Sequence, residues 1–290
     1  MSARPNFIYV GPDKAGSSWL HEVLIAHPQV FMPQAKDLYF FDRYYDKGLG
    51  WYLKHFEGAR PEHRVVGEVC QDYLADPRCP ARIEESLGQV RTMVTLRDPA
   101  DRAYSSYLYM LKHGETPGTF LQALTGRPEL LEHGRYGAGL LRYQERFGRD
   151  SVFVAVFDDL VADPQVFVDD LLRWLGVDPV VLGEEMLQAR LPAGRARSLV
   201  MARLARLGAN AVRAADGANL VGRVKRSQLV QRALYRPLGD DRPEMTVQER
   251  AAVHEALADD LALLQQLVDD LDLAARWGWP RPRDLTPRAP

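Results

Sequence analysis

The sequence predicts an α/β fold, a P-loop-like three-layer sandwich with a central parallel sheet and a helical C-terminal region. Two observations lead to this. Short β-rich runs alternate with segments of helical periodicity along the first 180 or so residues. A glycine-bounded loop also follows the first run and opens onto an amphipathic segment. Strands that alternate with helices imply a parallel sheet covered on both faces.

The elements follow in order along the chain. Strands are predicted at Phe7–Val10, Arg64–Glu68, Val90–Leu96 and Ser151–Phe157. Helices are predicted at Ser17–Ala26, Ala100–Lys112, Phe120–Leu124, Tyr136–Phe147 and Pro164–Leu175. Ligands of such sheets bind beyond the carboxyl ends of the strands. We therefore expect the loop after Val10 and the residues after Leu96 to converge on one ligand.

The last third of the chain has a different character. From Arg190 to Arg236, within a segment of about 190–240, many arginines face a single acid, Asp216, which is typical either of a solvated helical face or of a basic flap over an anionic ligand. A capping box at Thr246–Glu249 then starts a long helix over about 246–276, marked by leucines on one face. We expect this helix to pack on a core formed by residues 6–178, within a single domain of residues 1–290.

Composition excludes several classes of protein. The chain has 290 residues, 46% hydrophobic and 26% charged, with a net charge of −2, which disfavours a nucleic-acid or membrane-surface binder. The two cysteines are expected to be free thiols. There is no room for a signal peptide before the first strand, and no uncharged apolar run reaches the ~20 residues of a membrane span. A cytoplasmic protein without membrane or nucleic-acid partners is expected, and its oligomeric state is left open.

The loop after the first strand has the composition of an anion site. Gly11 and Gly16 are spaced as in a P-loop, but Ser17 and Ser18 follow where that motif has lysine and a hydroxyl residue. Lys14 lies inside the loop instead. Free backbone N–H groups at a helix N-terminus favour a phosphate group, and the lysine adds a positive charge.

A second candidate site follows the strand that ends at Leu96. Arg97 can place two donors on a phosphate, and Ser105, eight residues later inside a predicted helix, can add a hydroxyl group. Taken alone, Arg97 is better explained by an ion pair with Asp98 or Asp101.

Together, the two patterns resemble the sulfotransferases that use 3′-phosphoadenosine 5′-phosphosulfate (PAPS). The resemblance implies that the first loop holds the 5′-phosphosulfate and that Arg97 and Ser105 hold the 3′-phosphate. The implied loop contacts are Lys14, Ala15, Gly16, Ser17, Ser18 and Trp19. Local charge suggests that Arg195 and Arg197 close over the 3′-phosphate from the basic segment.

A third segment, Lys36–Tyr52, resembles the Lys-Glu-x-His-Phe-Phe-Asp region of heparan sulfate N- and 3-O-sulfotransferases. There the glutamate is the base that acts on the acceptor, so the resemblance implies this role for Asp37, with Glu68 as the reserve. The implied acceptor contacts are Tyr39, Phe41, Asp42, Glu68 and Tyr73. A salt bridge of Asp37 with Lys36 or Arg43, and core packing of Phe41, are the competing interpretations.

This sequence departs from that branch in its acceptor segments. Asp37 replaces the glutamate, Tyr39 replaces the histidine, and Glu68–Tyr73 lacks the lysine that contacts sulfated sugar. A heparan-type polyanion is therefore disfavoured. The acceptor is expected to be a hydroxyl group, or an amine, of a small molecule such as a secondary metabolite, or of a glycan.

The resemblance implies in-line sulfuryl transfer, in which Lys14 stabilises the leaving phosphate, Asp37 takes the proton and 3′-phosphoadenosine 5′-phosphate (PAP) is the product. No metal is required, and no cluster of residues has metal-ligand spacing. Two alternatives remain: a P-loop kinase or NTPase, and a non-catalytic nucleotide-binding scaffold.

Overall fold

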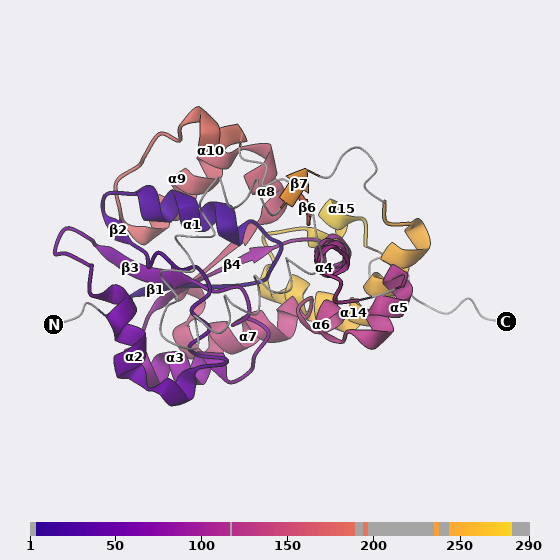
Figure 1. Cartoon of the computed structure of the whole chain (residues 1–290), viewed down its shortest axis with the longest axis horizontal. Helices are drawn as coiled ribbons and strands as arrows, with labels where there is room; N and C mark the ends of the chain where they lie inside the picture. Colours follow the sequence, from indigo (N-terminus) through magenta and orange to yellow (C-terminus); the bar gives the residue numbers. More distant parts are fainter. Residues whose placement is uncertain (1–3, 117, 189–193, 197–234, 238–243, 280–290) are drawn as a thin grey trace.

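A computed structural model describes residues 4–116, 118–188, 194–196, 235–237 and 244–279. Its centre is a five-stranded sheet of order β2-β3-β1-β4-β5, in which every neighbouring pair is parallel (Figure 1). The strands are β1 (Phe7–Gly11), β2 (Val30–Phe31), β3 (Val65–Val69), β4 (Arg91–Leu96) and β5 (Val152–Val156). The predicted α/β fold with a central parallel sheet is confirmed.

Both faces of the sheet are buried, as the strand sequences require. In β1, Phe7 and Tyr9 enter one apolar cluster, whereas Ile8 and Val10 enter the other. This follows from the two-residue repeat of a strand, which sends successive side chains to opposite faces. β1 therefore carries apolar residues throughout and lies in the middle of the sheet.

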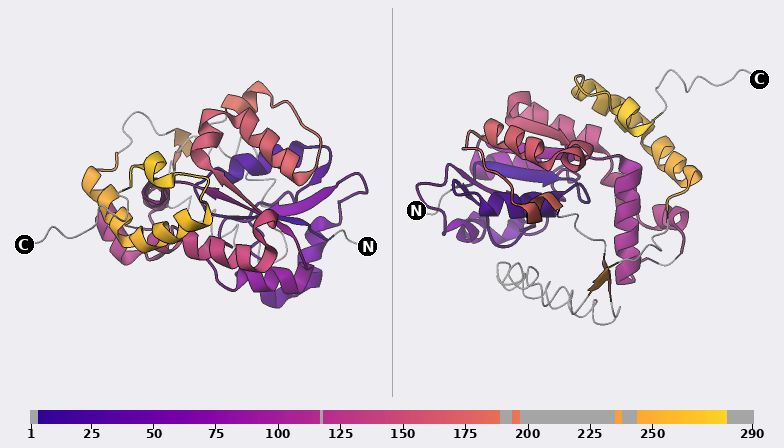
Figure 2. Two further views of the ribbon diagram at one scale, coloured as in Figure 1. Left: turned by 180° about the vertical axis from the view of Figure 1, so that it is seen from behind. Right: turned by 90° about the horizontal axis from the view of Figure 1, so that it is seen from above.

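Helices cover the two faces and one end of the sheet (Figure 1). One face carries α1 (Ser17–Ala26), α8 (Phe157–Ala162), α9 (Pro164–Leu175) and α10 (Glu184–Gln188). The other carries α2 (Leu49–Leu53), α3 (Cys79–Leu87) and α7 (Tyr136–Phe147). Beside them lie α4 (Pro99–His113), α5 (Phe120–Gly126), α6 (Glu129–Glu132), α14 (Val247–Leu267) and α15 (Leu273–Trp277), seen from two further sides in Figure 2.

The C-terminal helix packs on the core, but it is shorter than expected. α14 ends at Leu267 and a separate helix, α15, begins at Leu273. The break has a local cause: Asp272 accepts a hydrogen bond from the N–H of Ala275 at 3.0 Å and so starts a new helix. The predicted capping box at the start of α14 is present, with Thr246 and Glu249 bonded reciprocally.

α14 is joined to α7 by a polar contact inside the core. The carboxylate of Asp260 accepts hydrogen bonds from the N–H groups of Gly137 and Ala138, at 2.8 and 2.9 Å, at the N-terminus of α7. The two backbones approach closely there, because a Cβ on Gly137 would lie 2.5 Å from the carbonyl oxygen of Asp260. Glycine is therefore required at this position of α7.

The strand order places three loops at one edge of the sheet. β1 lies between β3 and β4, so the chain leaves the carboxyl ends of these three strands at neighbouring points. This is the position at which ligands bind in open α/β sheets. Most of the expected basic flap lies outside the described residues. Within it, β6 (Gly194–Ala196) pairs antiparallel with β7 (Tyr235–Pro237).

Candidate active site

The loop after β1 leads into the N-terminus of α1. Gly16 precedes this helix with φ 86°, and no side chain among the described residues caps this end of α1. This positive φ favours glycine, and a Cβ on Gly16 would lie 2.6 Å from Cδ2 of Leu160, so the Leu160 side chain would have to shift. Ser17 is buried in the first turn and Ser18 is exposed. The N–H groups at this end of α1 can therefore donate hydrogen bonds to an anion.

Lys14 is partly buried in this loop and has a left-handed backbone conformation, with φ 60°. Its Nζ atom lies 3.8 Å from the ring centroid of Tyr109 in α4. Burial lowers the pKa of Lys14 to about 8, and the nearby Lys36 and Arg102 act in the same direction. The ammonium group is thus a poorly hydrated cation that lies over the ring of Tyr109.

A buried ion pair holds the loop in place. Arg102 of α4 is fully buried, and its Nη1 donates to Oδ1 of Asp13 at 3.0 Å, while its Nη2 donates to the carbonyl oxygen of Leu130. Nδ1 of His133 lies 3.5 Å from the same Asp13 oxygen. Burial alone would raise the pKa of Asp13, but Arg102 and His133 hold it well below its ordinary value. Asp13 therefore remains ionised next to Lys14 and joins the loop to α4.

Arg97 directly follows β4 and reaches the same loop. Its Nη1 donates to the carbonyl oxygen of Lys14 at 2.6 Å, and its guanidinium group lies 4.7 Å from the ring of Phe157. The two carboxylates expected to compete for Arg97 are held elsewhere: Asp98 and Asp101 both form ion pairs with Arg250 of α14. The structure therefore brings Arg97 to the anion loop.

Asp37 lies beside the carboxyl end of β3. Nζ of Lys36 lies 2.8 Å from both of its carboxylate oxygens, and the N–H of Gln71 donates to Oδ1 at 3.2 Å. The side chains of Lys36 and Asp37 are only 15% and 13% exposed. The salt bridge foreseen as the competing interpretation is thus present, although it is largely buried rather than on the surface.

Backbone strain is concentrated at these residues. Among the described residues, Lys14, Asp37 and Tyr39 are those other than glycine with positive φ, at 60°, 62° and 55°. Left-handed backbone conformations are costly for such residues and cluster at functional sites. These strained residues are also predicted site residues, which supports a functional role for the Lys14 loop and for the segment around Asp37.

Glu68 is buried behind the Asp37 segment. It is 1% exposed, and its Oε1 accepts hydrogen bonds from the hydroxyl groups of Tyr52 and Tyr73 at 2.9 and 3.2 Å. Burial raises the pKa of Glu68 to about 8. The hydroxyl oxygen of Tyr73 also accepts the N–H of Phe40 at 2.9 Å, so this buried cluster fixes the backbone that follows Asp37.

Replacing Glu68 with glutamine tests this protonation state. The folded protein holds the Glu68 proton up to about pH 8, whereas the unfolded chain releases it near the ordinary value of 4.5. The folded state thus binds more protons in this window, so its stability falls as the pH rises. We expect the free energy of unfolding, measured by urea denaturation, to fall less between about pH 5 and about pH 8 in Glu68→Gln than in the wild type. Exposed Glu57→Gln is the control, and parallel pH profiles for Glu68→Gln and the wild type would contradict the assignment.

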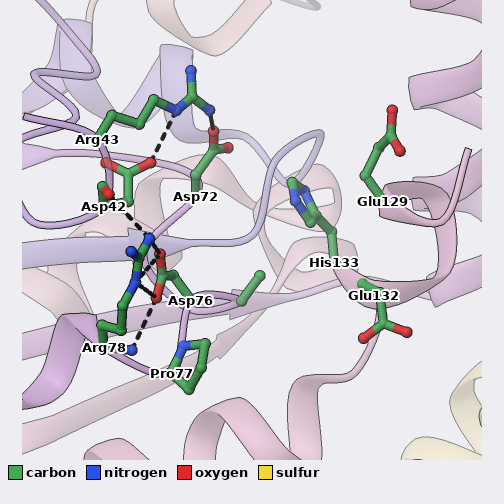
Figure 3. Close-up of a pocket in the computed structure, with 10 residues that line it drawn as sticks. Asp42, Arg43, Asp72, Asp76, Pro77, Arg78, Glu129, Glu132 and His133 are labelled. Atoms are coloured by element: carbon green, nitrogen blue, oxygen red, sulfur yellow. Dashed lines mark hydrogen bonds and ion pairs between the residues drawn. The ribbon is translucent and has the colours of Figure 1, made fainter.

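A cleft of about 530 Å³ opens next to the loop (Figure 3). His133 connects the cleft to the loop, because it lines the cleft and also contacts Asp13. Arg43 forms an ion pair with Asp72 in one wall of the cleft, and its guanidinium carbon lies 3.9 Å from the ring of Tyr39 (Figure 3). The charged and titratable residues that line it are Asp42, Arg43, Asp72, Asp76, Arg78, Glu129, Glu132 and His133.

The remaining predicted contacts divide into four groups. Phe41 and Tyr73 are fully buried in the core, as the competing interpretation of Phe41 expected. The ring of Trp19 packs on Phe167, and its Nε1 donates to the carbonyl oxygen of Met186, so only its backbone belongs to the loop. Ser105 is partly buried in α4, and Ala15 is buried in the loop. The backbone of Arg195 lies in β6, and Arg197 lies outside the described residues.

Sequence reasoning missed Asp13 and its two partners, Arg102 and His133. An acidic residue directly before Lys14 was the available signal for the first of these. Nothing in the spacing pairs residue 13 with residues 102 and 133. In the described part of the chain, no group of three or more His, Cys, Asp or Glu residues could hold a metal ion. No helix of that part is long and apolar enough to cross a membrane.

Comparison with known proteins points to one family. The sulfotransferase domain model matches residues 4–191. The membrane-associated sulfotransferase kil1 of Dictyostelium discoideum is 33% identical over 118 residues, 39% of this chain and 25% of that protein. Mouse bifunctional heparan sulfate N-deacetylase/N-sulfotransferase 4 is 27% identical over 197 residues, 60% of this chain and 22% of that protein. The chain spans a quarter or less of the length of these two relatives.

Solved structures share the fold. A sulfotransferase from Alicyclobacillus acidocaldarius superposes with a TM-score of 0.69 at 24% identity, covering 95% of this chain and 99% of that one. Mouse sulfotransferase SULT7A1, solved in complex with PAP, gives a TM-score of 0.50 at 15% identity, covering 96% and 88%.

Proposed function

Because this chain belongs to the sulfotransferase domain family, we propose that it transfers a sulfuryl group from PAPS to a hydroxyl group, or an amine, of a small-molecule or glycan acceptor. The observation that carries the proposal is the convergence of Lys14, the uncapped N-terminus of α1 and Arg97 at one edge of the sheet. A related fold in complex with PAP, mouse SULT7A1, supports the choice of donor.

The residues present fit a nucleotide that carries two phosphate groups. No side chain of the described residues caps the N-terminus of α1, and Lys14 adds a cation in the loop that leads into it. We assign the 5′-phosphosulfate to this end, with Ser17 and Ser18 as hydroxyl donors. Arg97 and Ser105 are assigned to the 3′-phosphate, because Arg97 is held at the loop and Ser105 lies two turns into α4. When bound, the donor supplies an activated sulfuryl group.

We propose distinct chemical roles for Lys14 and Asp37. Lys14 and the N–H groups of α1 stabilise the negative charge that grows on the phosphate oxygen as its bond to sulfur breaks. Asp37 takes the proton of the acceptor as the new bond to sulfur forms. One carboxylate oxygen must leave Lys36 for this step, since both are held at 2.8 Å. Glu68 is assigned a positioning role, because it is buried and bonded to Tyr52 and Tyr73.

A P-loop kinase or NTPase fits the site less well. It requires a lysine at the position of Ser17 and an acidic residue free to bind magnesium after a strand. Asp98 is the candidate for the latter role, but it caps α4 by accepting the N–H of Ala100 at 2.7 Å and pairs with Arg250.

Binding and transfer assays test the proposal. The protein is titrated with PAP and with ATP–Mg²⁺, and sulfate transfer from labelled PAPS is then measured on a panel of hydroxylated and amine acceptors. We expect PAP to bind more tightly than ATP–Mg²⁺ and at least one acceptor to be sulfated. The reverse order of affinities would contradict the sulfotransferase assignment, and PAP binding with no transfer to any acceptor would favour the non-catalytic scaffold.

A further inference from the structure

Tyr109 shares a face of α4 with Ser105. The two residues are four positions apart in one helix, so their side chains lie one above the other. Two other tyrosines of α4 are buried, Tyr104 at 8% and Tyr107 at 6% exposure, whereas Tyr109 is 42% exposed. An exposed aromatic ring next to the assigned 3′-phosphate residue calls for an explanation other than core packing.

The ring of Tyr109 contacts the ammonium group of Lys14, which lies in the loop after β1. Nζ of Lys14 lies 3.8 Å from the ring centroid of Tyr109, well within the ~6 Å at which a cation is attracted to an aromatic face. His113 supports the ring, with the two ring centroids 4.1 Å apart. Its Nδ1 also lies 2.8 Å from the carbonyl oxygen of Tyr109. Tyr109 is therefore in contact with both Lys14 and His113.

The contact with the Tyr109 ring offsets the hydration that Lys14 loses when it is buried. Lys14 is partly buried and gives up much of its hydration, which destabilises the ammonium form. The charged groups that face it come from its own loop, from the Lys36 segment and from α4: Asp13 and Asp37 favour the cation, whereas Lys36 and Arg102 oppose it. The face of an aromatic ring attracts the desolvated ammonium without adding a charge that would repel a phosphate.

We propose that Tyr109 is a positioning residue that holds the ammonium group of Lys14 at the N-terminus of α1, ready to receive the 5′-phosphate end of the donor. The inference rests on the proposed function, since it assigns the partner of Lys14 to that donor. Helix α4 would then serve both ends of the assigned donor site, because it carries both Ser105 and the ring that contacts Lys14.

PAP binding to Tyr109→Leu and Tyr109→Phe, measured by isothermal titration calorimetry, tests the proposal. Removing the ring is expected to raise the Kd for PAP by about 2- to 30-fold, the range that a cation–π contact of ~0.5–2 kcal/mol gives. Phenylalanine keeps the ring face and is expected to bind within about 2-fold of the wild type, as the contact does not use the hydroxyl group.

The pH dependence of the same titrations separates positioning from folding. Without the ring, the pKa of Lys14 falls further below its value of about 8 in the free protein. PAP affinity should then decline at a lower pH in Tyr109→Leu than in Tyr109→Phe, a shift that a merely structural role would not produce. Tyr44→Leu is the matched control, since it removes a ring that lies 5.4 Å from Nζ of Lys47 in another segment.

Three results would overturn the proposal. Unchanged PAP affinity in Tyr109→Leu would show that the ring does not position Lys14. Equal losses in the leucine and phenylalanine variants would assign the effect to the hydroxyl group. Failure of the wild-type protein to bind PAP would overturn both this inference and the proposed function, and so differs from the first two results.

Discussion

Lys14→Ala is expected to lower the rate of sulfuryl transfer by at least ~10²–10³-fold, the loss typical of removing one preorganised donor to a developing negative charge. The reason is geometric as well as electrostatic. Lys14 is partly buried beside an uncapped helix N-terminus, so water cannot readily replace its ammonium group. Alanine also keeps an ordinary side-chain Cβ at the strained φ of 60°, so the change removes the charge without relieving the backbone.

The measurement is kcat with labelled PAPS and an acceptor identified by the panel. Exposed Lys54→Ala is the matched control and should retain wild-type activity. Lys14→Arg keeps a positive charge with a different shape and is expected to fall between the two. Near-normal turnover by Lys14→Ala would exclude Lys14 from the reaction.

Asp37→Asn is expected to lower kcat by about 10²–10⁴-fold, the usual contribution of a general base. The affinity for PAP should remain close to that of the wild type, because Asp37 is assigned to the acceptor rather than to the donor. Asparagine preserves the size of the side chain and its acceptance of the Gln71 N–H. Binding of PAP and single-turnover transfer are therefore measured on the same preparation.

The ion pair with Lys36 requires a control of its own. Lys36→Gln removes the pair but leaves the carboxylate, so it should retain most of the transfer activity if Asp37 acts as the base. Asp37→Glu restores the residue found in the heparan sulfate branch and should also remain active. Equal losses in Asp37→Asn and Lys36→Gln would instead indicate that the pair holds the segment in place.

The sequence predicts the sheet and the anion loop well because both depend on local patterns. Helices α1, α7 and α9 have the predicted bounds, and the four longer strands lie within a residue or two of their predicted positions. The two-residue strand β2 and the helices α2, α3, α6, α8 and α10 are not predicted by the sequence pattern; except for α3 they have six residues or fewer, and segments of that length carry little periodicity. The break between α14 and α15 depends on the cap formed by Asp272 within a segment whose leucine pattern runs on.

The candidate site was predictable where a single segment carries it. The spacing of the loop singles out Lys14 and Gly16, whereas Arg97 is assigned through the resemblance to sulfotransferases, and all three assignments remain predictions. The side chains that hold these residues in place could not be predicted, because they come from distant parts of the chain. Arg250 binds Asp98 and Asp101 from about 150 positions away, while Arg97 donates to the carbonyl oxygen of Lys14.

The positive φ angles at Lys14, Asp37 and Tyr39 have a consequence for protein engineering. Glycine adopts this backbone conformation without steric cost, so a search for a more heat-resistant variant would be drawn to these three positions. The same substitutions would delete the ammonium group, the carboxylate and the ring that line the two loops. If these residues act as proposed, the same substitutions would raise thermal tolerance and lower turnover, so a screen that selects for one property should also measure the other.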